Sequence, residues 1–145
     1  EDVIQKLVFV CSDVMKTASF DNATRQTALE LVSTLAEQSA KMLRAQQDTL
    51  KQHFFPAIFI MLTEVEDNMA DWLAEEEADV HGKEGISDVA SEALERLADQ
   101  LGEKTMVECS SHLIMEGCAK ADSWQYRQAG FVFLGMISEA CEKHF

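Results

Sequence analysis

Apolar residues recur at the spacing of an α-helix along almost the whole chain, and this periodicity constrains the fold more than any other feature. Residues three or four positions apart share one side of a helix, whereas a strand places alternate residues on one side. Strand-like alternation is nearly absent, and helix breakers are scarce, with six glycines and one proline in 145 residues. The sequence therefore predicts an all-α protein of about one domain in size.

Six helices are expected, and their ends are marked by residues that favour capping. They cover about residues 2–16, 22–38, 46–65, 88–101, 105–120 and 122–143. Asp21 or Asn22 can cap the second helix, because a short side-chain oxygen accepts hydrogen bonds from free first-turn N–H groups. Ser87 is the expected cap of the fourth helix, and Thr105 with Glu108 has the spacing of a capping box for the fifth.

Three of these helices show a clear apolar face. The expected inward positions are Val3, Leu7, Val10, Cys11 and Val14 in the first helix, Ala28, Leu31, Val32 and Leu35 in the second, and Val89, Ala93, Leu94, Leu97 and Leu101 in the fourth. Pro56 lies inside the third helix. Because proline lacks an N–H and clashes with the preceding turn, it should kink this helix or start a new one.

Two segments far apart in the chain can be laid over each other. "TRQTALELVSTLAE" begins at Thr24 and "YRQAGFVFLGMISE" begins at Tyr126, so that Arg25 meets Arg127. The helix "VASEALERLADQL" joins the same register, with Ala93 under Ala28. A period of about 40 residues with two helices per unit is typical of HEAT repeats. The predicted fold is an α-α superhelix, a HEAT-repeat solenoid of about three helix pairs: residues 1–39, 46–102 and 104–143.

An acidic insertion interrupts the second pair, over about residues 64–86. Eight of the residues from 64 to 79 are Asp or Glu and none is Lys or Arg, which supplies -8 of the formal net charge of -14. Such a run is commonly a solvated linker. A long loop placed inside a compact repeat is also often functional, and Trp72 either stacks on a partner's Lys or Arg or packs back on the solenoid.

The net charge limits which classes of partner are expected, and the cysteines indicate the redox compartment. A surface this acidic repels phosphate backbones and anionic lipid, and nucleic acid and membranes are therefore not expected as partners. A basic protein or peptide is the expected partner. No apolar run approaches the ~20 residues that span a bilayer. We expect the four cysteines, Cys11, Cys109, Cys118 and Cys141, to be small buried hydrophobes in a reducing compartment.

Five features in order carry a resemblance to a known family. They are the "ALELVSTLAEQSAKMLR" helix over 28–44, Pro56 in the next helix, the acidic run with Trp72, the "ALERLADQLG" helix over 93–102, and "WQYRQAG" over 124–130. In this order the chain resembles the importin-beta superfamily of nuclear transport receptors, of the importin beta-3 (karyopherin beta-3) type. Because the chain opens with Glu1 rather than Met, we expect a piece of a longer solenoid.

The resemblance implies the partners and the faces they use. Such receptors shuttle between cytoplasm and nucleus, carry cargo with basic localisation signals, and release it when Ran in its GTP state binds. Second helices line the concave face, where cargo and Ran lie, and first helices form the convex face, where Phe-Gly nucleoporins dock. In the acidic insertion the implied partner-binding residues are Glu64, Glu66, Asp67, Asp71, Trp72, Glu75, Glu76, Glu77 and Asp79.

Further candidates lie on the second helices. The possible concave-face contacts are Glu30, Glu37, Glu92, Glu95, Asp99, Trp124 and Glu139. For each acid, ordinary exposed helix charge is an equal alternative, and for Trp124 packing between repeats is favoured. Arg25 and Arg127 are expected to be structural, tying neighbouring repeats together through a carboxylate or a helix end.

The residues do not predict an enzyme. Glu108 and His112 are four apart on one helix, but no second pair of this kind exists, so no metal site is expected. There is no glycine-rich phosphate loop and no nucleophile elbow, and no cofactor is implied. Binding is therefore the expected function, with a HEAT scaffold that organises other proteins, such as a phosphatase regulatory subunit, as the alternative to a transport receptor.

Overall fold

The computed structural model describes residues 2–64, 85–120 and 122–142, and within these ranges all regular structure is helical. The helices are α1 (Asp2–Lys16), α2 (Asn22–Gln38), α3 (Ala40–Arg44), α4 (Gln47–Thr49), the π-helix η1 (Leu50–Phe54), α5 (Phe55–Leu62), α7 (Ile86–Leu101), α8 (Glu103–Ala119) and α9 (Trp124–Glu142). Helix positions in the chain match the sequence prediction closely. One short helix, α3, was not expected as a separate element.

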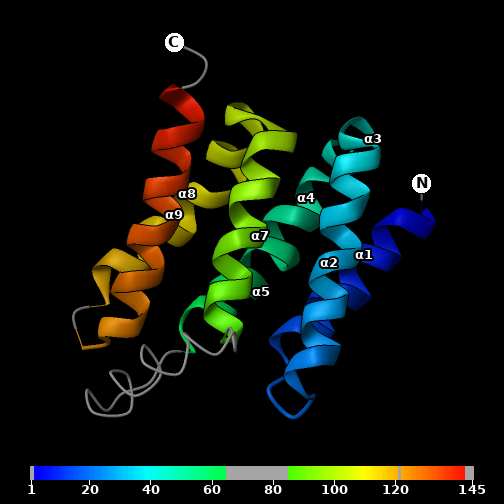
Figure 1. Ribbon diagram of the computed structural model, residues 1–145. Helices are drawn as coiled ribbons and strands as arrows, with labels where there is room; N and C mark the ends of the chain where they lie inside the picture. Colours follow the sequence, from blue (N-terminus) through cyan, green and yellow to red (C-terminus); the bar gives the residue numbers. More distant parts are fainter. Residues whose placement is uncertain (1, 65–84, 121, 143–145) are drawn as a thin grey trace, which may run out of the picture.

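The helices form two layers (Figure 1). The second helices of the three pairs, α2, α7 and α9, lie side by side in the front layer, and the first helices α1, α5 and α8 lie behind them. Helix α7 contacts α2 on one side and α9 on the other, and α5 contacts α1 and α8 in the same order. This stacking of antiparallel pairs is the arrangement of a HEAT-type solenoid, so the predicted fold class is confirmed.

The buried faces of α1 and α2 differ from the predicted ones. Val3 and Val10 of α1 are exposed, and Val8 and Met15 are buried instead. On α2, Leu31 is 47% exposed, and the buried positions include Leu29 and Ala36. Both helices belong to the first pair, which has a neighbouring pair on one side only, so part of each apolar face has nothing to pack against. The predicted stripe of α7 is fully buried and is therefore confirmed.

Of the three predicted helix caps, one is confirmed and two are wrong. Asp21 caps α2, because its Oδ1 accepts a hydrogen bond of 2.7 Å from the Thr24 N–H. Helix α7 begins before Ser87, with Gly85 as its cap and the Gly85 N–H donating to Asp88 at 3.4 Å. Thr105 is a buried residue inside α8, which starts directly after Gly102; a φ of 85° at this glycine lets the chain reverse between the two helices.

Pro56 does not break its helix. An α-helix would require the Pro56 nitrogen to donate to the carbonyl four residues earlier, which proline cannot do. The preceding turn widens instead: η1 is a π-helix, in which Phe55 N–H donates to Leu50 O, five residues back. Helix α5 then starts with proline in its first turn, where a missing N–H costs little. The predicted disturbance at Pro56 is therefore a local change of helix type.

Aromatic rings and one close backbone approach join the second and third pairs. Phe59 on α5 lies 5.8 Å from Phe133 and 5.7 Å from Tyr126 on α9, measured between ring centroids. Gly117 on α8 lies directly against them: a Cβ there would come within 2.8 Å of Phe59 Cζ and 2.9 Å of the Tyr126 carbonyl oxygen. Only glycine fits this position, so α5, α8 and α9 approach one another more closely than a side chain would allow.

Candidate binding surface on the second helices

The three long second helices carry more negative charge than the helices behind them. Helices α2, α7 and α9 contain eight Asp or Glu residues and three Arg residues, a net charge of -5. Helices α1, α4, η1, α5 and α8 contain six acids and four Lys residues, a net charge of -2. The short helix α3, which contacts α2 and α7, adds Lys41 and Arg44, so with it this layer has a net charge of -3; the excess of carboxylates lies along the three long helices.

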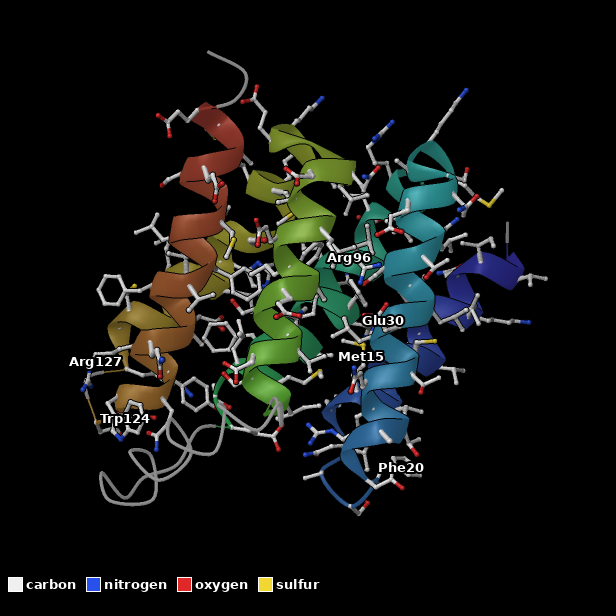
Figure 2. The ribbon with its side chains drawn as sticks, in the orientation of Figure 1. Met15, Phe20, Glu30, Arg96, Trp124 and Arg127 are labelled. Atoms are coloured by element: carbon white, nitrogen blue, oxygen red, sulfur yellow. The ribbon has the colours of Figure 1, made fainter. Side chains whose placement is uncertain are left out.

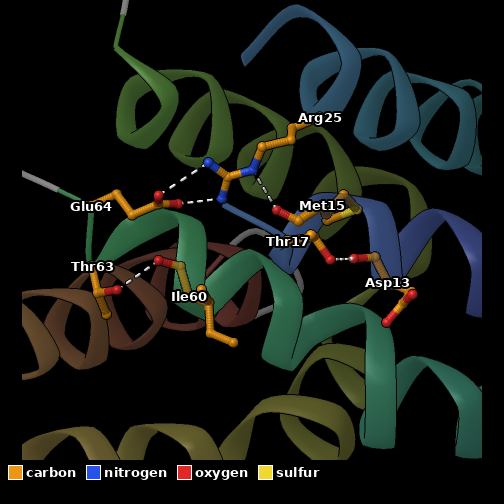
Figure 3. A network of polar contacts seen from close by, with 7 residues as sticks. All are labelled: Asp13, Met15, Thr17, Arg25, Ile60, Thr63 and Glu64. Atoms are coloured by element: carbon orange, nitrogen blue, oxygen red, sulfur yellow. Dashed lines mark hydrogen bonds and ion pairs between the residues drawn. The ribbon is translucent and has the colours of Figure 1, made fainter. Parts of the chain in front are cut away.

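Arg25, the first arginine of this layer, is 2% exposed and bonds to α1 and to Glu64, which follows α5 (Figure 3). Its Nε donates to Met15 O in the last turn of α1 at 2.8 Å. Its Nη1 donates to Glu64 Oε1 at 3.0 Å, and its Nη2 pairs with the other oxygen of the same carboxylate. The guanidinium thus ties the first helix pair to the end of α5 in the second. The predicted structural role of Arg25, through a carboxylate and a helix end, is confirmed.

Arg96 on α7 pairs with two glutamates of α2 and so joins these two helices on their exposed side (Figure 2). Its Nη1 lies 2.9 and 3.0 Å from the two oxygens of Glu30, and its Nη2 lies 2.7 Å from Glu37 Oε1. Hydrogen bonds to Glu30 and then Glu37 raise the pKa of the Arg96 guanidinium, so it stays charged. Two of the predicted concave-face carboxylates are thus bonded to an arginine of the same chain. Sequence reasoning missed Arg96, whose partners lie 59 and 66 residues away.

Arg127 on α9 repeats part of the Arg25 geometry. Its Nη1 donates to the carbonyl of Lys120, directly after α8, at 3.2 Å. Arg25 likewise bonds the carbonyl of Met15, in the last turn of α1. In both pairs an arginine of the second helix therefore holds the end of the first helix, which supports the repeat alignment made from sequence.

The remaining predicted acids of the layer face outward. Glu92, Glu95 and Asp99 on α7 and Glu139 on α9 are all exposed. Three of them, Glu95, Asp99 and Glu139, line one small hollow between α7 and α9, together with Met136. The structure therefore brings carboxylates of two neighbouring helix pairs to a common surface. We call Glu92, Glu95, Asp99 and Glu139 the acidic strip.

Trp124 and Glu64 are the two remaining predicted site residues that the structure describes. Trp124 is the first residue of α9 and is exposed, next to the junction where Lys120 Nζ lies 4.3 Å from the centre of the Tyr126 ring. Glu64 is the one predicted insertion acid among the described residues, and it is the partner of Arg25. The other predicted insertion residues, Glu66 through Asp79 with Trp72, lie outside the described ranges.

The first-helix layer has an open cleft of different character. It lies between α1 and the segment formed by α4 and η1, and its lining includes Phe9, Val10, Gln52 and His53. Phe9 and Val10 are exposed, and the Phe9 and His53 rings form a T-shaped contact with centroids 4.8 Å apart. The cleft offers apolar side chains on a face that carries little net charge.

The cysteines are free thiols in different surroundings. Cys11 and Cys109 are buried as predicted, and burial raises the pKa of both, that of Cys109 to about 11. Cys118 is exposed and Cys141 is half-buried, which corrects the prediction for these two residues, although the Cys118 Sγ would lie 3.2 Å from a Cβ placed on the buried Gly130. Among the described residues, no three His, Cys, Asp or Glu side chains are grouped to hold a metal ion. No described helix is both long and apolar enough to cross a membrane.

The stacked helix pairs, with second helices in one layer and first helices in the other, define a HEAT-type helical solenoid. Comparison with known proteins agrees: the family model described as "Importin repeat" matches residues 17–108, well over half of the chain. The chain belongs to this importin-repeat family. It is also similar to "Importin subunit beta-3" of Saccharomyces cerevisiae (strain ATCC 204508 / S288c), with 26% identity over 144 residues. This alignment covers 97% of the chain but 13% of the length of the yeast protein.

Proposed function

We propose that this chain is part of a nuclear transport receptor and that its second-helix layer binds a basic partner. The observation that carries the proposal is the excess of carboxylates along the three long second helices: α2, α7 and α9 have a net charge of -5, and their three arginines are each bonded within the chain. Carboxylates in excess over cations attract lysine- and arginine-rich segments. Membership of the importin-repeat family supports a transport role over a catalytic one.

The acidic strip is the part of the layer that we assign to basic cargo. Glu30 and Glu37 already bind the Arg96 guanidinium, so a cargo arginine would have to compete with it. The members of the acidic strip come from two adjacent helix pairs, and three of them, Glu95, Asp99 and Glu139, line a common hollow between α7 and α9. The Debye length is about 8 Å at physiological ionic strength, so affinity has to come from direct contacts with these carboxylates.

Ran in its GTP state and the Phe-Gly nucleoporins complete the proposed set of partners. We assign Ran to the second-helix side and the acidic insertion, as the family resemblance implies. The cleft beside Phe9 and Val10 lies on the first-helix side, and its exposed apolar side chains suit a phenylalanine of a Phe-Gly repeat. A protein with these partners shuttles between cytoplasm and nucleus.

The experiment compares two triple variants that remove the same amount of charge. One carries Glu92→Gln, Glu95→Gln and Asp99→Asn on α7; the control carries Glu103→Gln, Glu108→Gln and Glu116→Gln on α8, in the other layer. Binding of a fluorescent lysine- and arginine-rich localisation peptide is measured by anisotropy. We expect the α7 variant to bind about tenfold or more weakly, about 1.4 kcal/mol, and the control to change little. Equal loss in both variants would reduce the effect to net charge and contradict the proposal.

A further variant and a pulldown sharpen the test. Arg96→Ala removes the internal competitor, so it should strengthen peptide binding by exposing Glu30 and Glu37 to the peptide. The longer natural protein should capture Ran more strongly in the GTP than in the GDP state. Failure to capture either form at low salt would count against the receptor assignment.

A further inference from the structure

The turn between α7 and α8 has an open hollow whose charge differs from that of the chain as a whole. Its lining consists of Arg44 of α3 together with Leu101, Gly102, Glu103, Lys104 and Thr105. Two of these residues are cations and one is an acid, whereas the whole chain has a net charge of -14. A local excess of positive charge on so acidic a chain indicates a ligand of opposite charge to the proposed cargo.

Helix α8 begins at this hollow without a side-chain cap. Its first hydrogen bond runs from the Met106 N–H to the Gly102 carbonyl at 3.1 Å, so the N–H groups of the three residues between them have no acceptor within the helix. Gly102 has no atom within 4 Å of where a Cβ would stand, so a ligand can approach the backbone there. Free N–H groups at a helix start attract anions, because the positive end of the helix dipole lies at the same place.

The Thr105 hydroxyl points to a ligand independently of the helix start. Thr105 is only 6% exposed, yet it is one of the residues that line the hollow. Its hydroxyl makes no hydrogen bond to any residue that the structure describes, whereas the buried hydroxyls of Ser12 and Ser33 each donate to the carbonyl four residues earlier. A hydroxyl this deeply buried without a partner is unfavourable, and an oxygen atom of a ligand in the hollow would accept its hydrogen bond.

Arg44 and Lys104 supply the positive charge from two different helices. Arg44, the last residue of α3, donates from Nη1 to the Gln100 carbonyl near the end of α7 at 3.3 Å, and this bond holds its side chain at the turn. Lys104 is the second residue of α8 and is exposed. The half-buried Glu103 opposes them, since its carboxylate repels an anion in the same hollow. Two cations and a helix start against one carboxylate leave a net attraction for an anion.

We infer that this hollow at the α7–α8 turn, which we call the α8 hollow, binds a phosphoryl group. Phosphate oxygens accept hydrogen bonds from backbone N–H groups, a hydroxyl and a guanidinium at once, and a phosphate monoester carries about -1.5 to -2 charges near pH 7. A carboxylate carries a single charge and has fewer accepting oxygens. The group is either free inorganic phosphate or the phosphate of a phosphorylated serine. The hollow has a volume of about 360 Å³ and is open to solvent, so it has room for a peptide that carries phosphoserine.

The test titrates the 145-residue chain with three probes at constant ionic strength. They are inorganic phosphate, a short neutral peptide that carries one phosphoserine, and the same peptide without the phosphate. Binding is followed by NMR of the isotope-labelled protein. We expect both phosphate probes to shift the amide signals of residues 103–105 with a Kd below about 10 mM, and the unphosphorylated peptide to leave them unchanged. A lower Kd for the phosphopeptide assigns the site to a phosphorylated partner, and a lower Kd for inorganic phosphate assigns it to the free ion.

Four variants and one control test the contributing residues. Thr105→Val removes the hydroxyl and keeps the shape, and Arg44→Gln and Lys104→Gln each remove one charge; each should weaken binding of the tighter probe by about threefold or more. Glu103→Gln should strengthen it, because the repelling carboxylate is gone. Lys6→Gln removes the same charge from an exposed lysine of α1 and should leave binding unchanged. The melting temperature of Thr105→Val should stay the same or rise, because the hydroxyl has no hydrogen bond to lose.

Three results would overturn the inference. They are no amide shifts up to about 50 mM phosphate, the same shifts with the unphosphorylated peptide, and an equal loss of binding in Lys6→Gln and Arg44→Gln. The third would show that the net charge of the chain governs binding rather than the α8 hollow. A phosphoserine peptide and a basic localisation peptide have opposite charges, so the outcome here is separate from the outcome for the proposed cargo surface.

Discussion

Arg25 on α2 and Glu64 after α5 form an ion pair that spans 39 residues of sequence and joins two helix pairs. The guanidinium is nearly inaccessible to water, whereas the carboxylate is 31% exposed. A buried arginine without its carboxylate keeps a charge in a poorly solvated place, which is costly. The same pair fixes the position of Glu64, two residues after the end of α5.

Removing Arg25 should therefore destabilise the protein far more than removing a surface charge. We expect Arg25→Ala to lower the free energy of unfolding by about 3 kcal/mol, because Met15 O and Glu64 also lose their donor. Asp13→Asn, which breaks the exposed Lys16–Asp13 pair at 3.8 Å, should cost below about 1 kcal/mol. Urea denaturation measures both. Similar values for the two variants would show that the Arg25 bonds contribute no more than a surface pair.

Two glycine-to-alanine changes should have opposite effects. Gly117→Ala places a Cβ within 2.8 Å of Phe59 and 2.9 Å of a backbone oxygen, so we expect a loss of about 1–3 kcal/mol from overpacking. Gly135→Ala meets nothing within 4 Å and improves helix propensity, which should add about 0.5–1 kcal/mol. Thermal unfolding of both variants provides the comparison, and a neutral Gly117→Ala would mean that α8 and α9 can move apart without cost.

The Asp21 cap should make stability depend on pH in the acid range. Hydrogen bonds from the side chain and backbone N–H of Thr24 lower the pKa of this carboxyl below its ordinary value of 3.8. The folded state thus prefers the charged form, and the stabilisation is present above the ordinary value and lost as the pH falls through the folded pKa. Asp21→Asn keeps an accepting oxygen without the titration, so its melting temperature should vary less with pH below about 4. Identical pH profiles for the two proteins would refute this.

The four thiols should react with iodoacetamide in an order set by exposure and ionisation. We expect Cys118 to react first, Cys141 next, and Cys11 and Cys109 last. Burial also raises the pKa of Cys109 from 9.0 to about 11, which leaves about 100-fold less of its reactive thiolate near pH 8. Mass spectrometry of timed samples gives the order. The differences should vanish in urea, and early labelling of Cys109 in the folded protein would contradict its burial.

Local sequence signals predicted most of the fold. The helix positions, the Asp21 cap and the disturbance at Pro56 each depend on residues within one or two turns, where spacing and side-chain chemistry act directly. The alignment of Arg25 with Arg127 also revealed the repeat and the structural role of Arg25. By contrast, the inward faces of α1 and α2 were predicted with Val3, Val10 and Leu31 buried, and these residues are exposed. Periodicity shows that a face is apolar but not whether a neighbour covers it.

The candidate site was harder to predict, because its details depend on contacts between helices. Glu30 and Glu37 have the same character in sequence as Glu92 and Glu95, yet the first two bind Arg96 and the others face outward. Arg96 is 59 residues from Glu37, so no local pattern connects them. Likewise, the need for glycine at position 117 arises from Phe59 and Tyr126 on other helices. The predicted partner contacts of the acidic strip remain predictions.

The π-turn before Pro56 changes the phase of its helix. Each π-turn takes up one more residue than an α-turn, so Phe55 lies above Leu50, where Phe54 would lie in a regular α-helix. Leu50, Phe54 and Phe55 are all fully buried as a result. The wider turn accommodates one extra residue. The aromatic side chains that follow are therefore rotated toward α9 by about one residue, roughly 100°. The ring contact between Phe55 and Phe133, at 6.3 Å, is set by that rotation.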